Sequence, residues 1–398
     1  MTRRLCVLAW LLSAGLAGCN GAVGSGTPPA PGGVGAPAQR NPAANVSDDQ
    51  AAGDVADYYL QRMSYAAPDQ RVQSRIVALN AYARRAGGVS PAASPAVGGS
   101  ASSDGADSAG VPATAAPLPA AVPAFTPQAL EPPAFPSDDG PAKKLAEQAG
   151  VTLVHRVADP KTPAQPPVDR IDITRGSVAW HIDLLTGLIG FQKEHTAGVI
   201  ENGAERAREV AVSFLQHHGG IPEDAVEVNP VYQMTQGDTA AAPKPTSITF
   251  VWRHNDPSII GADAIAVTVT PGTQGFNATP APNAALEVTA YTRLWRAAGK
   301  PLAADKTPPM TAAQALAQLA RGAALPASAK VTAVVFGGLR AAPSEAPLRT
   351  RPAWAFQVGD AWYAVDAIGG AVSGSTALGV PSDAIAMAAK AKPAAATR

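Results

Sequence analysis

Residues 177–191 read Ser-Val-Ala-Trp-His-Ile-Asp-Leu-Leu-Thr-Gly-Leu-Ile-Gly-Phe. In the first half of this stretch, large apolar residues alternate with small or polar ones, which is typical of a β-strand with one buried face. Asp183 can cap a tight turn with its carboxylate, and Gly187 can adopt a positive φ, so that the chain returns through Leu188 to Phe191. The stretch therefore predicts an antiparallel β-hairpin.

The same arrangement recurs near the end of the chain. Residues 362–372 read Trp-Tyr-Ala-Val-Asp-Ala-Ile-Gly-Gly-Ala-Val, and Asp366 and Gly370 have the spacing of the Asp and Gly in the first hairpin. Two helices are predicted between the hairpins. One covers Glu201 to His218, with an apolar stripe that ends before a Gly pair, and the other begins at Thr311, which can form a capping box with Gln314.

Further strands are predicted at residues 247–253, 259–269 and 286–295, where β-branched and aromatic residues alternate with small or polar ones. We expect residues 264–270 to pair with 286–294, with 271–285 as a long hairpin loop. Helices and strands in this order predict an α+β fold, an antiparallel β-sheet with helices packed on one face. Two modules are expected, 141–300 and 301–378, and the sequence leaves open whether they share one sheet.

These pieces resemble PepSY-like modules and the related propeptides of thermolysin- and fungalysin-type metalloproteases. The resemblance rests on the Asp183–Gly187 hairpin, the helix end Val212–Leu215, the run Ile259–Asp263 and the closing Val365–Gly370, and it spans about residues 170–375. It implies a noncatalytic envelope domain that binds, inhibits or helps to fold a protein partner. Strands at 259–269 and 354–358 are candidates to accept an extended segment. The candidate partner-binding residues are Trp252, Ile260, Gly261, Asp263, Trp354 and Asp366.

The first residues predict export and a lipid anchor. Arg3 and Arg4 precede the short apolar run Leu5–Leu16, which is too short to span a bilayer. The following Leu-Ala-Gly-Cys, residues 16–19, resembles the lipobox of bacterial lipoproteins, which implies a signal peptide 1–18, acylation of Cys19 and attachment to the cell envelope. The alternative is an ordinary secretory signal with an incidental Cys. Asn20 after the Cys favours the outer membrane in the familiar sorting pattern.

Composition divides the rest of the chain. Gly, Pro, Ala and Ser dominate residues 19–44 and 88–140, which predict a disordered tether and a low-complexity linker, and residues 379–398 predict a disordered tail. Between the first two lies a helical segment, 45–87, with arginines at 71, 75, 84 and 85. It can pack on itself or on the main domain, or present a basic surface to phospholipid or peptidoglycan.

The sequence predicts no catalysis, no metal and no cofactor. Lys and Arg number 31 against 31 Asp and Glu, a balance that argues against nucleic acid as a partner. There is no His-Glu-x-x-His and no Gly-x-Ser-x-Gly. The adjacent His217 and His218 point about 100° apart on a helix, so a solvated helix end is the favoured interpretation. Five tryptophans from Trp180 to Trp362 can line a peptide groove, but strand alternation favours the core.

The leading hypothesis is a lipid-anchored envelope protein whose noncatalytic domain binds a protein or peptide. The alternative is a structural envelope lipoprotein that contacts cell wall or membrane through its basic helical segment. A third possibility is a hydrolase whose site has no recognised motif.

Overall fold

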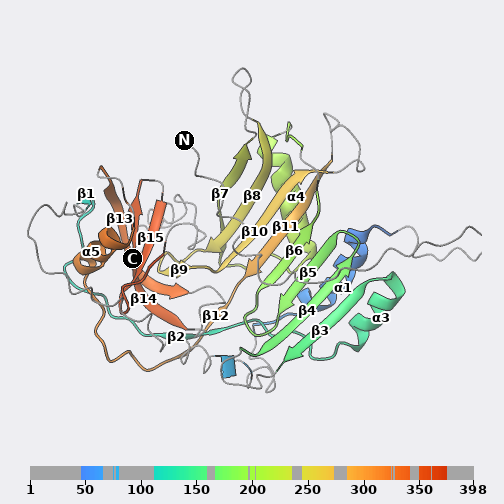
Figure 1. Ribbon diagram of the computed structural model, residues 1–398, viewed down its shortest axis with the longest axis horizontal. Coiled ribbons are helices and arrows are strands. Elements are labelled where there is room, and N and C mark those ends of the chain that lie inside the picture. The colour runs from blue at the N-terminus through green and yellow to red at the C-terminus, as the bar shows by residue number, and fades with distance from the viewer. Residues whose placement is uncertain are drawn as a thin grey trace, which may run out of the picture. The chain divides into compact units, whose positions relative to one another are not determined.

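Two β-sheets, the larger covered by three helices and the smaller by one, organise the described part of the chain (Figure 1). The structure is a computed structural model, and all its described residues fall within one compact unit, Val46–Arg398. The described residues are 46–65, 75, 78–79, 112–158, 166–195, 198–201, 203–234, 244–272, 285–323, 325, 328–340, 349–359 and 361–373.

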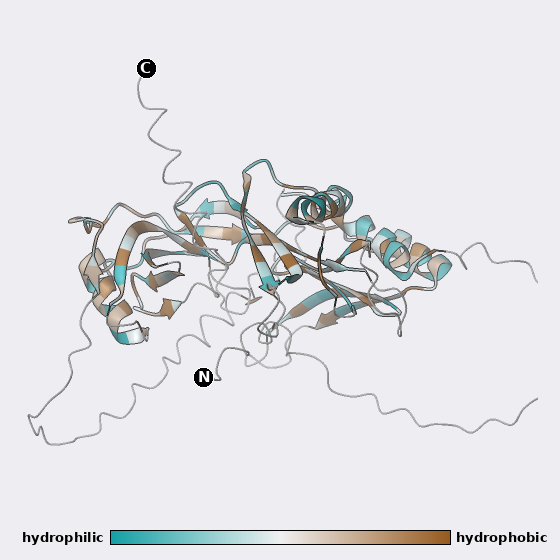
Figure 2. Ribbon diagram, turned by 90° about the horizontal axis from the view of Figure 1, so that it is seen from above, coloured by the Kyte–Doolittle hydropathy of each residue, from teal (hydrophilic) through white to brown (hydrophobic). Residues whose placement is uncertain are grey.

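The larger sheet has eight strands in the order β3-β4-β5-β6-β11-β10-β8-β7, and every neighbouring pair is antiparallel. Its strands change between apolar and polar residues along their length, which Figure 2 shows as brown and teal on the same ribbon. This alternation gives the sheet one apolar face and one polar face. Its strands are β3 (Thr152–Ala158), β4 (Val168–Arg175), β5 (Val178–Asp183), β6 (Ile189–Lys193), β7 (Ala225–Met234), β8 (Pro245–His254), β10 (Ala264–Pro271) and β11 (Leu286–Leu294).

Three helices cover the apolar face: α1 (Asp48–Leu60), α3 (Gly140–Ala149) and α4 (Gly203–His217). Helix α3 contacts β3, α1 contacts β4 and β5, and α4 contacts β8, β10 and β11. Trp180 lies in this core, 1% exposed, with Phe191 and Phe214 at ring-centroid distances of 4.8 and 6.0 Å. The helices are therefore packed on one face of the sheet, and the prediction of an α+β fold is confirmed.

The smaller sheet has six strands. In it β13 (Lys330–Arg340), β14 (Thr350–Val358), β15 (Ala361–Asp366) and β16 (Val372–Ser373) are antiparallel neighbours. Two short strands, β1 (Ala113–Thr114) and β9 (Ile259–Gly261), pair with β13 in parallel. Helix α5 (Ala312–Gly322) packs on this sheet through β14, β15 and β16. Strand β9 lies within the predicted module 141–300, yet it pairs with β13 in the sheet of the other module. The prediction missed this because an apolar run shows that a strand is buried but does not show which strand it pairs with.

The two predicted turns have the same geometry. The Oδ1 atom of Asp183 accepts the N–H groups of residues 185 and 186 at 2.9 Å, and the Oδ1 atom of Asp366 accepts those of residues 368 and 369 at 2.9 Å. Gly187 and Gly370 have φ values of 76° and 72°. The pairing of β10 with β11 and the capping box of Thr311 with Gln314 are also confirmed. Residues 273–284 of the predicted loop lie outside the described residues.

The predicted linker 88–140 is corrected over its second half. Strand β1 pairs with β13, and β2 (Gln128–Glu131) pairs with β12 (Ala297–Pro301) in a two-stranded sheet. Pro132 and Pro133 lie against Gly187, and Phe125 packs on Phe336 with ring centroids 6.1 Å apart. A Pro-rich segment cannot form a core of its own, but it can lie extended along one that exists. Residues 112–140 therefore run along the sheets and do not serve as a free spacer.

Of the predicted alternatives for the helical segment 45–87, packing on the main domain is the one found where the segment is described. Val55, Tyr59 and Leu60 of α1 are at most 1% exposed, and they pack in the same core as Trp180. Ion pairs hold the first turn of the helix, because Asp48 meets Arg175 at 2.9 Å. Helix α1 therefore covers the sheet and does not stand apart as a hairpin.

Other predictions concern segments outside the described residues: the signal peptide 1–18, Cys19, the tether 19–44, the arginines at 71, 84 and 85, and the tail 379–398. Among the helices that the structure describes, none has both the length and the apolar character needed to cross a bilayer.

Candidate functional site

All six candidate partner-binding residues lie in the interior. Five of them are at most 3% exposed and the sixth, Gly261, is also buried. The three-residue strand β9, which begins the predicted acceptor 259–269, pairs with β13 alone. Most of the backbone expected to accept a partner lies in interior strands: β10 lies between β8 and β11, and β14 between β13 and β15. This corrects the prediction, because alternation reports a buried face and does not distinguish an edge strand from a central one. The five are Trp252, Ile260, Asp263, Trp354 and Asp366.

Asp263 is instead the centre of a buried ion cluster between the two sheets. Its carboxylate accepts hydrogen bonds from the guanidinium groups of Arg296 and Arg340, the latter at 2.8 Å. Burial alone would raise the pKa of this carboxyl, but His254, Arg296 and Arg340 outweigh it and hold the pKa well below its usual range. Arg253 binds the carbonyls of residues 261 and 263, and burial lowers its pKa to about 10.

The remaining candidates shape the backbone. Gly261 has a φ of +121°, and a Cβ there would collide with the backbone of Arg340, so β9 can approach β13 only with a glycine at this point. The indole Nε1 of Trp354 donates to the Met310 carbonyl at 2.9 Å and fixes the entry to α5. These residues have structural roles.

The edge strands of the larger sheet are β3 and β7, and those of the smaller sheet, β1, β9 and β16, are only two or three residues long. Strand β7 contains Pro230, and its register with β8 shifts twice. Proline and bulges are devices that blunt an edge against pairing. Strand β3 has neither: its seven residues pair with β4 without a shift, and Val154 and Val157 are 39% and 40% exposed. Of the two edge strands of the larger sheet, β3 is therefore the better template for an added strand.

The hydrogen-bond pattern shows which groups of β3 face outward. The Asp169 carbonyl accepts the N–H of Leu184, so it points away from β3. Backbone groups of successive residues in a strand point to alternate sides, so the N–H and C=O groups of Arg170 and Asp172 point toward β3. Their partners in register, Arg156 and Val154, therefore bond to β4. The N–H and C=O groups of the alternate residues, Leu153, His155 and Val157, point to the free edge. Within the described chain no backbone group pairs with them.

His155, at the centre of this edge, is held on the helix side by two carboxylates. Its Nδ1 lies 2.6 Å from Asp139 and its Nε2 lies 2.7 Å from Asp169. An ionised carboxylate only accepts hydrogen bonds, so this arrangement favours the protonated imidazole, which donates from both ring nitrogens. The hydrogen bond to Asp169 is the main cause of a raised pKa for His155, and Asp139 adds to it against the effect of burial.

The network around His155 joins several elements. Asp169, whose side chain is 2% exposed, also accepts from Arg75 at 2.5 Å, and Asp139 accepts from the Tyr59 hydroxyl at 3.0 Å. Burial raises the pKa of Asp169, but the hydrogen bonds from His155 and Arg75 outweigh it and the pKa is lowered. The network fixes β3 to β4, α1 and α3, so this edge is held extended before any partner arrives.

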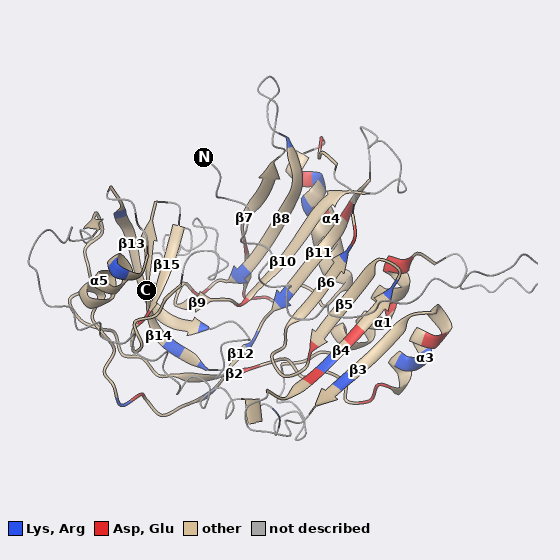
Figure 3. Cartoon of the chain, in the orientation of Figure 1, with Lys and Arg blue, Asp and Glu red and all other residues tan. Residues whose placement is uncertain are grey.

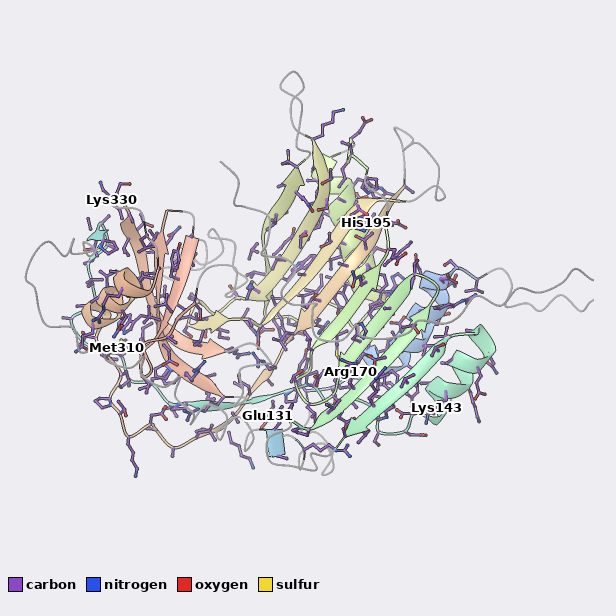
Figure 4. The ribbon with its side chains drawn as sticks, in the orientation of Figure 1. Glu131, Lys143, Arg170, His195, Met310 and Lys330 are labelled. Atoms are coloured by element: carbon purple, nitrogen blue, oxygen red, sulfur yellow. The ribbon has the colours of Figure 1, made fainter. Side chains whose placement is uncertain are left out.

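A second network lies beside β3 on the opposite face. Asp172 on β4 accepts hydrogen bonds from Arg156 at 2.8 Å, Arg170 at 3.2 Å and His181 at 2.8 Å. Figure 3 shows these acidic and basic positions side by side on β3 and β4, and Figure 4 labels Arg170. Burial raises the pKa of Asp172, but its basic partners, His181 first, bring it below the usual value.

Two basic groups differ from their predicted settings. His218 is not a solvated helix end: its Nδ1 lies 2.7 Å from Asp57 of α1, and its ring packs on Phe214 with centroids 4.3 Å apart. Arg75, the described arginine of the basic segment, turns inward to Asp169. The inward carboxylates were the signal that sequence reasoning missed, because Asp169 shares strand parity with Ile171 and Ile173, and a charge on an apolar face requires a partner.

Within the described ranges, no three His, Cys, Asp or Glu side chains are grouped so that they could hold a metal ion. Hydrogen bonds from His155 go to carboxylates only, and no described Ser or Cys joins that network. The networks beside β3 are thus arranged to position backbone and charge.

Comparison with known proteins gives little further information. No protein-family model matches the chain, and no curated protein matches its sequence. Among solved structures, the chain is similar to the C-terminal domain of YpeB from Bacillus megaterium, with 13% sequence identity, coverage of 56% of this chain and 88% of that domain, and a TM-score of 0.27.

Proposed function

We propose that this protein is a lipid-anchored envelope protein whose noncatalytic, PepSY-like domain binds an extended segment of a partner protein by adding it as a strand to β3. The observation that carries the proposal is the free edge of β3. It offers three outward backbone positions, at Leu153, His155 and Val157, with no proline and no bulge. An added strand would obtain affinity from main-chain hydrogen bonds and specificity from side chains on either face.

Preorganisation supports this function. Ordering a flexible strand on binding costs free energy, and a strand that is already fixed avoids much of that cost. The imidazole of His155 is held from both sides by Asp139 and Asp169, so the middle of the edge is fixed in the extended form. The repeated Asp–Gly hairpins and the sheet with helices on one face agree with the PepSY-like resemblance.

Anchoring remains an expectation from the sequence, resting on Cys19 and the residues before it. The alternative of a structural lipoprotein with a basic contact helix has less support, since the described arginine of that segment, Arg75, is paired with Asp169.

The test is photocrosslinking in cells with a photoreactive phenylalanine analogue at position 154, which is exposed beside the edge. It is combined with Val157→Pro, which removes an outward N–H, or with Val157→Ala, which removes side-chain atoms but keeps that N–H. We expect an adduct in the Val157→Ala protein and its loss in the Val157→Pro protein. Mass spectrometry of the adduct should identify one contiguous segment of one envelope protein.

Val157→Pro leaves the bonds to β4 intact, because those come from the alternate residues of β3, so the fold should be retained. Circular dichroism and the unfolding midpoint check this. Identical adducts in both variants would contradict strand addition and would give the structural alternative first place.

A further inference from the structure

The polar face of the sheet beside the β3 edge presents more positive than negative charge to solvent. Arg156, Arg170 and His181 have side chains 60%, 38% and 47% exposed, whereas the carboxylate they share, Asp172, is only 8% exposed. The next acidic residue in register, Asp183, is directed into its own turn, where it accepts two backbone N–H groups. A partner that approaches this face therefore meets guanidinium groups first.

The charges within the cluster do not balance. Two guanidinium groups share the one carboxylate of Asp172, so one positive charge is in excess even with His181 neutral. Arg156 uses its Nε for Asp172, and its side chain is 60% exposed on the edge strand. Guanidinium groups have a planar donor geometry that matches a carboxylate, which makes Arg156 a suitable receptor for one.

The strand register places Arg156 next to an incoming strand. Its backbone bonds to β4, so its position opposite an antiparallel partner would be a non-hydrogen-bonded pair, the type in which side chains on one face lie closest. A residue directly across from Arg156 would project on the same polar face. Opposite charges in such pairs are favourable, and like charges are unfavourable.

We infer that the segment that adds to β3 carries an Asp or Glu directly opposite Arg156, whose guanidinium group binds that carboxylate. This inference rests on the proposed strand addition and names the chemistry of its partner. A second copy of this chain is a poorer occupant, because β3 carries no Asp or Glu that could lie opposite Arg156.

The test uses the full-length protein in detergent and three blocked heptapeptides with a neutral fluorophore, Thr-Val-Thr-X-Thr-Val-Thr with X as Glu, Gln or Lys. Binding is followed by fluorescence anisotropy at low and high salt. We expect the Glu peptide to bind about fivefold more tightly than the Gln peptide, with the Lys peptide weakest. The preference should decrease at high salt, because ions screen an exposed pair.

Three variants locate the effect. Arg156→Gln should abolish the preference for Glu, Arg156→Lys should retain part of it, and Arg208→Gln, which changes a comparably exposed arginine on α4, should leave it unchanged. If the three peptides bind equally, and this binding is lost in Val157→Pro but kept in Val157→Ala, the carboxylate inference is overturned while strand addition stands. Absence of binding by every peptide, or binding unaffected by Val157→Pro, would overturn strand addition and the inference with it. Dimerisation of the protein alone through β3 would also contradict the inference.

Discussion

Arg340 ends β13 of the smaller sheet and Asp263 immediately precedes β10 of the larger one, and their side chains meet at 2.8 Å in the interior. Arg296 binds the same carboxylate, and neither Asp263 nor Arg296 is more than 2% exposed. One buried carboxylate therefore joins the two sheets through arginines that lie 33 and 77 residues away along the chain.

Replacing Asp263 by Asn should strongly destabilise the folded protein. The substitution keeps the shape but leaves two buried guanidinium groups without a counter-charge, and breaking such a cluster typically costs about 3–5 kcal/mol. We expect the free energy of unfolding in urea to fall by that order. Glu209→Gln removes an acid from an exposed pair on α4 and serves as the control, with no measurable change. Equal effects of the two substitutions would show that the cluster does not hold the sheets.

The fold was predictable where chemistry is local, and the outcome at Asp263 shows where it was not. The Asp183 and Asp366 turns and the Thr311 cap depend on residues two to four positions apart, which the sequence displays directly. The partners of Asp263 lie 33 and 77 residues away, and no pattern links them. Edge and central strands also alternate alike, so the accessible edge at β3 could be found only from the pairing.

Stability should depend on pH through His155. Its pKa in the folded protein is raised above the ordinary value of 6.5, so its contribution is complete below about pH 6.5 and is lost as the pH rises through the folded pKa. At acid pH the dependence comes from Asp169: its pKa is lowered in the folded protein, so the stability it contributes is lost as the pH falls below about 3.8. His155→Gln should remove the alkaline part, on the order of 1 kcal/mol. Unfolding midpoints from pH 5 to 9 measure it, and His217→Gln, at an exposed position, should follow the wild type.

Leu60→Ala tests whether α1 belongs to the domain. Leu60 is 1% exposed in the core of the larger sheet, and a cavity at such a site costs about 2–5 kcal/mol. The exposed Leu302, at 37%, provides a matched control that should change little. Thermal unfolding of both variants decides the question. A small effect at Leu60 would favour the alternative in which the segment 45–87 packs on itself.

The paired turns offer an internal comparison. Alanine at Gly370 meets only the strain of a positive φ, about 1–2 kcal/mol, since the nearest side-chain atoms are 3.5 Å from its Cβ. Alanine at Gly187 adds a collision with Pro133 at 2.6 Å, so Gly187→Ala should cost clearly more. Chemical denaturation of the two variants gives the difference. Equal costs would indicate that residues 112–140 do not pack against the first turn.

If Cys19 is acylated, removing its thiol should change where the protein is found in the cell. Cys19→Ser should prevent incorporation of labelled palmitate and release the protein from the membrane fraction, because acyl chains supply the anchor. Cys6→Ser lies in the predicted signal and should have no effect. Absence of labelling in the wild-type protein would replace the lipoprotein assignment by that of an ordinary secreted protein, and unaltered labelling of Cys19→Ser would exclude Cys19 as the acylated residue.

The pairing of β1 with β13 also bears on how the chain reaches its native state. Ala113 aligns with Lys330 more than 200 residues later, and Ser64 bridges to Ala134 nearer the start. Contacts of such long sequence separation slow folding, because a large loop must close before they form. The smaller sheet cannot be completed until almost all of the chain has been synthesised, so a growing chain would stay incompletely folded for most of its synthesis, a state compatible with export.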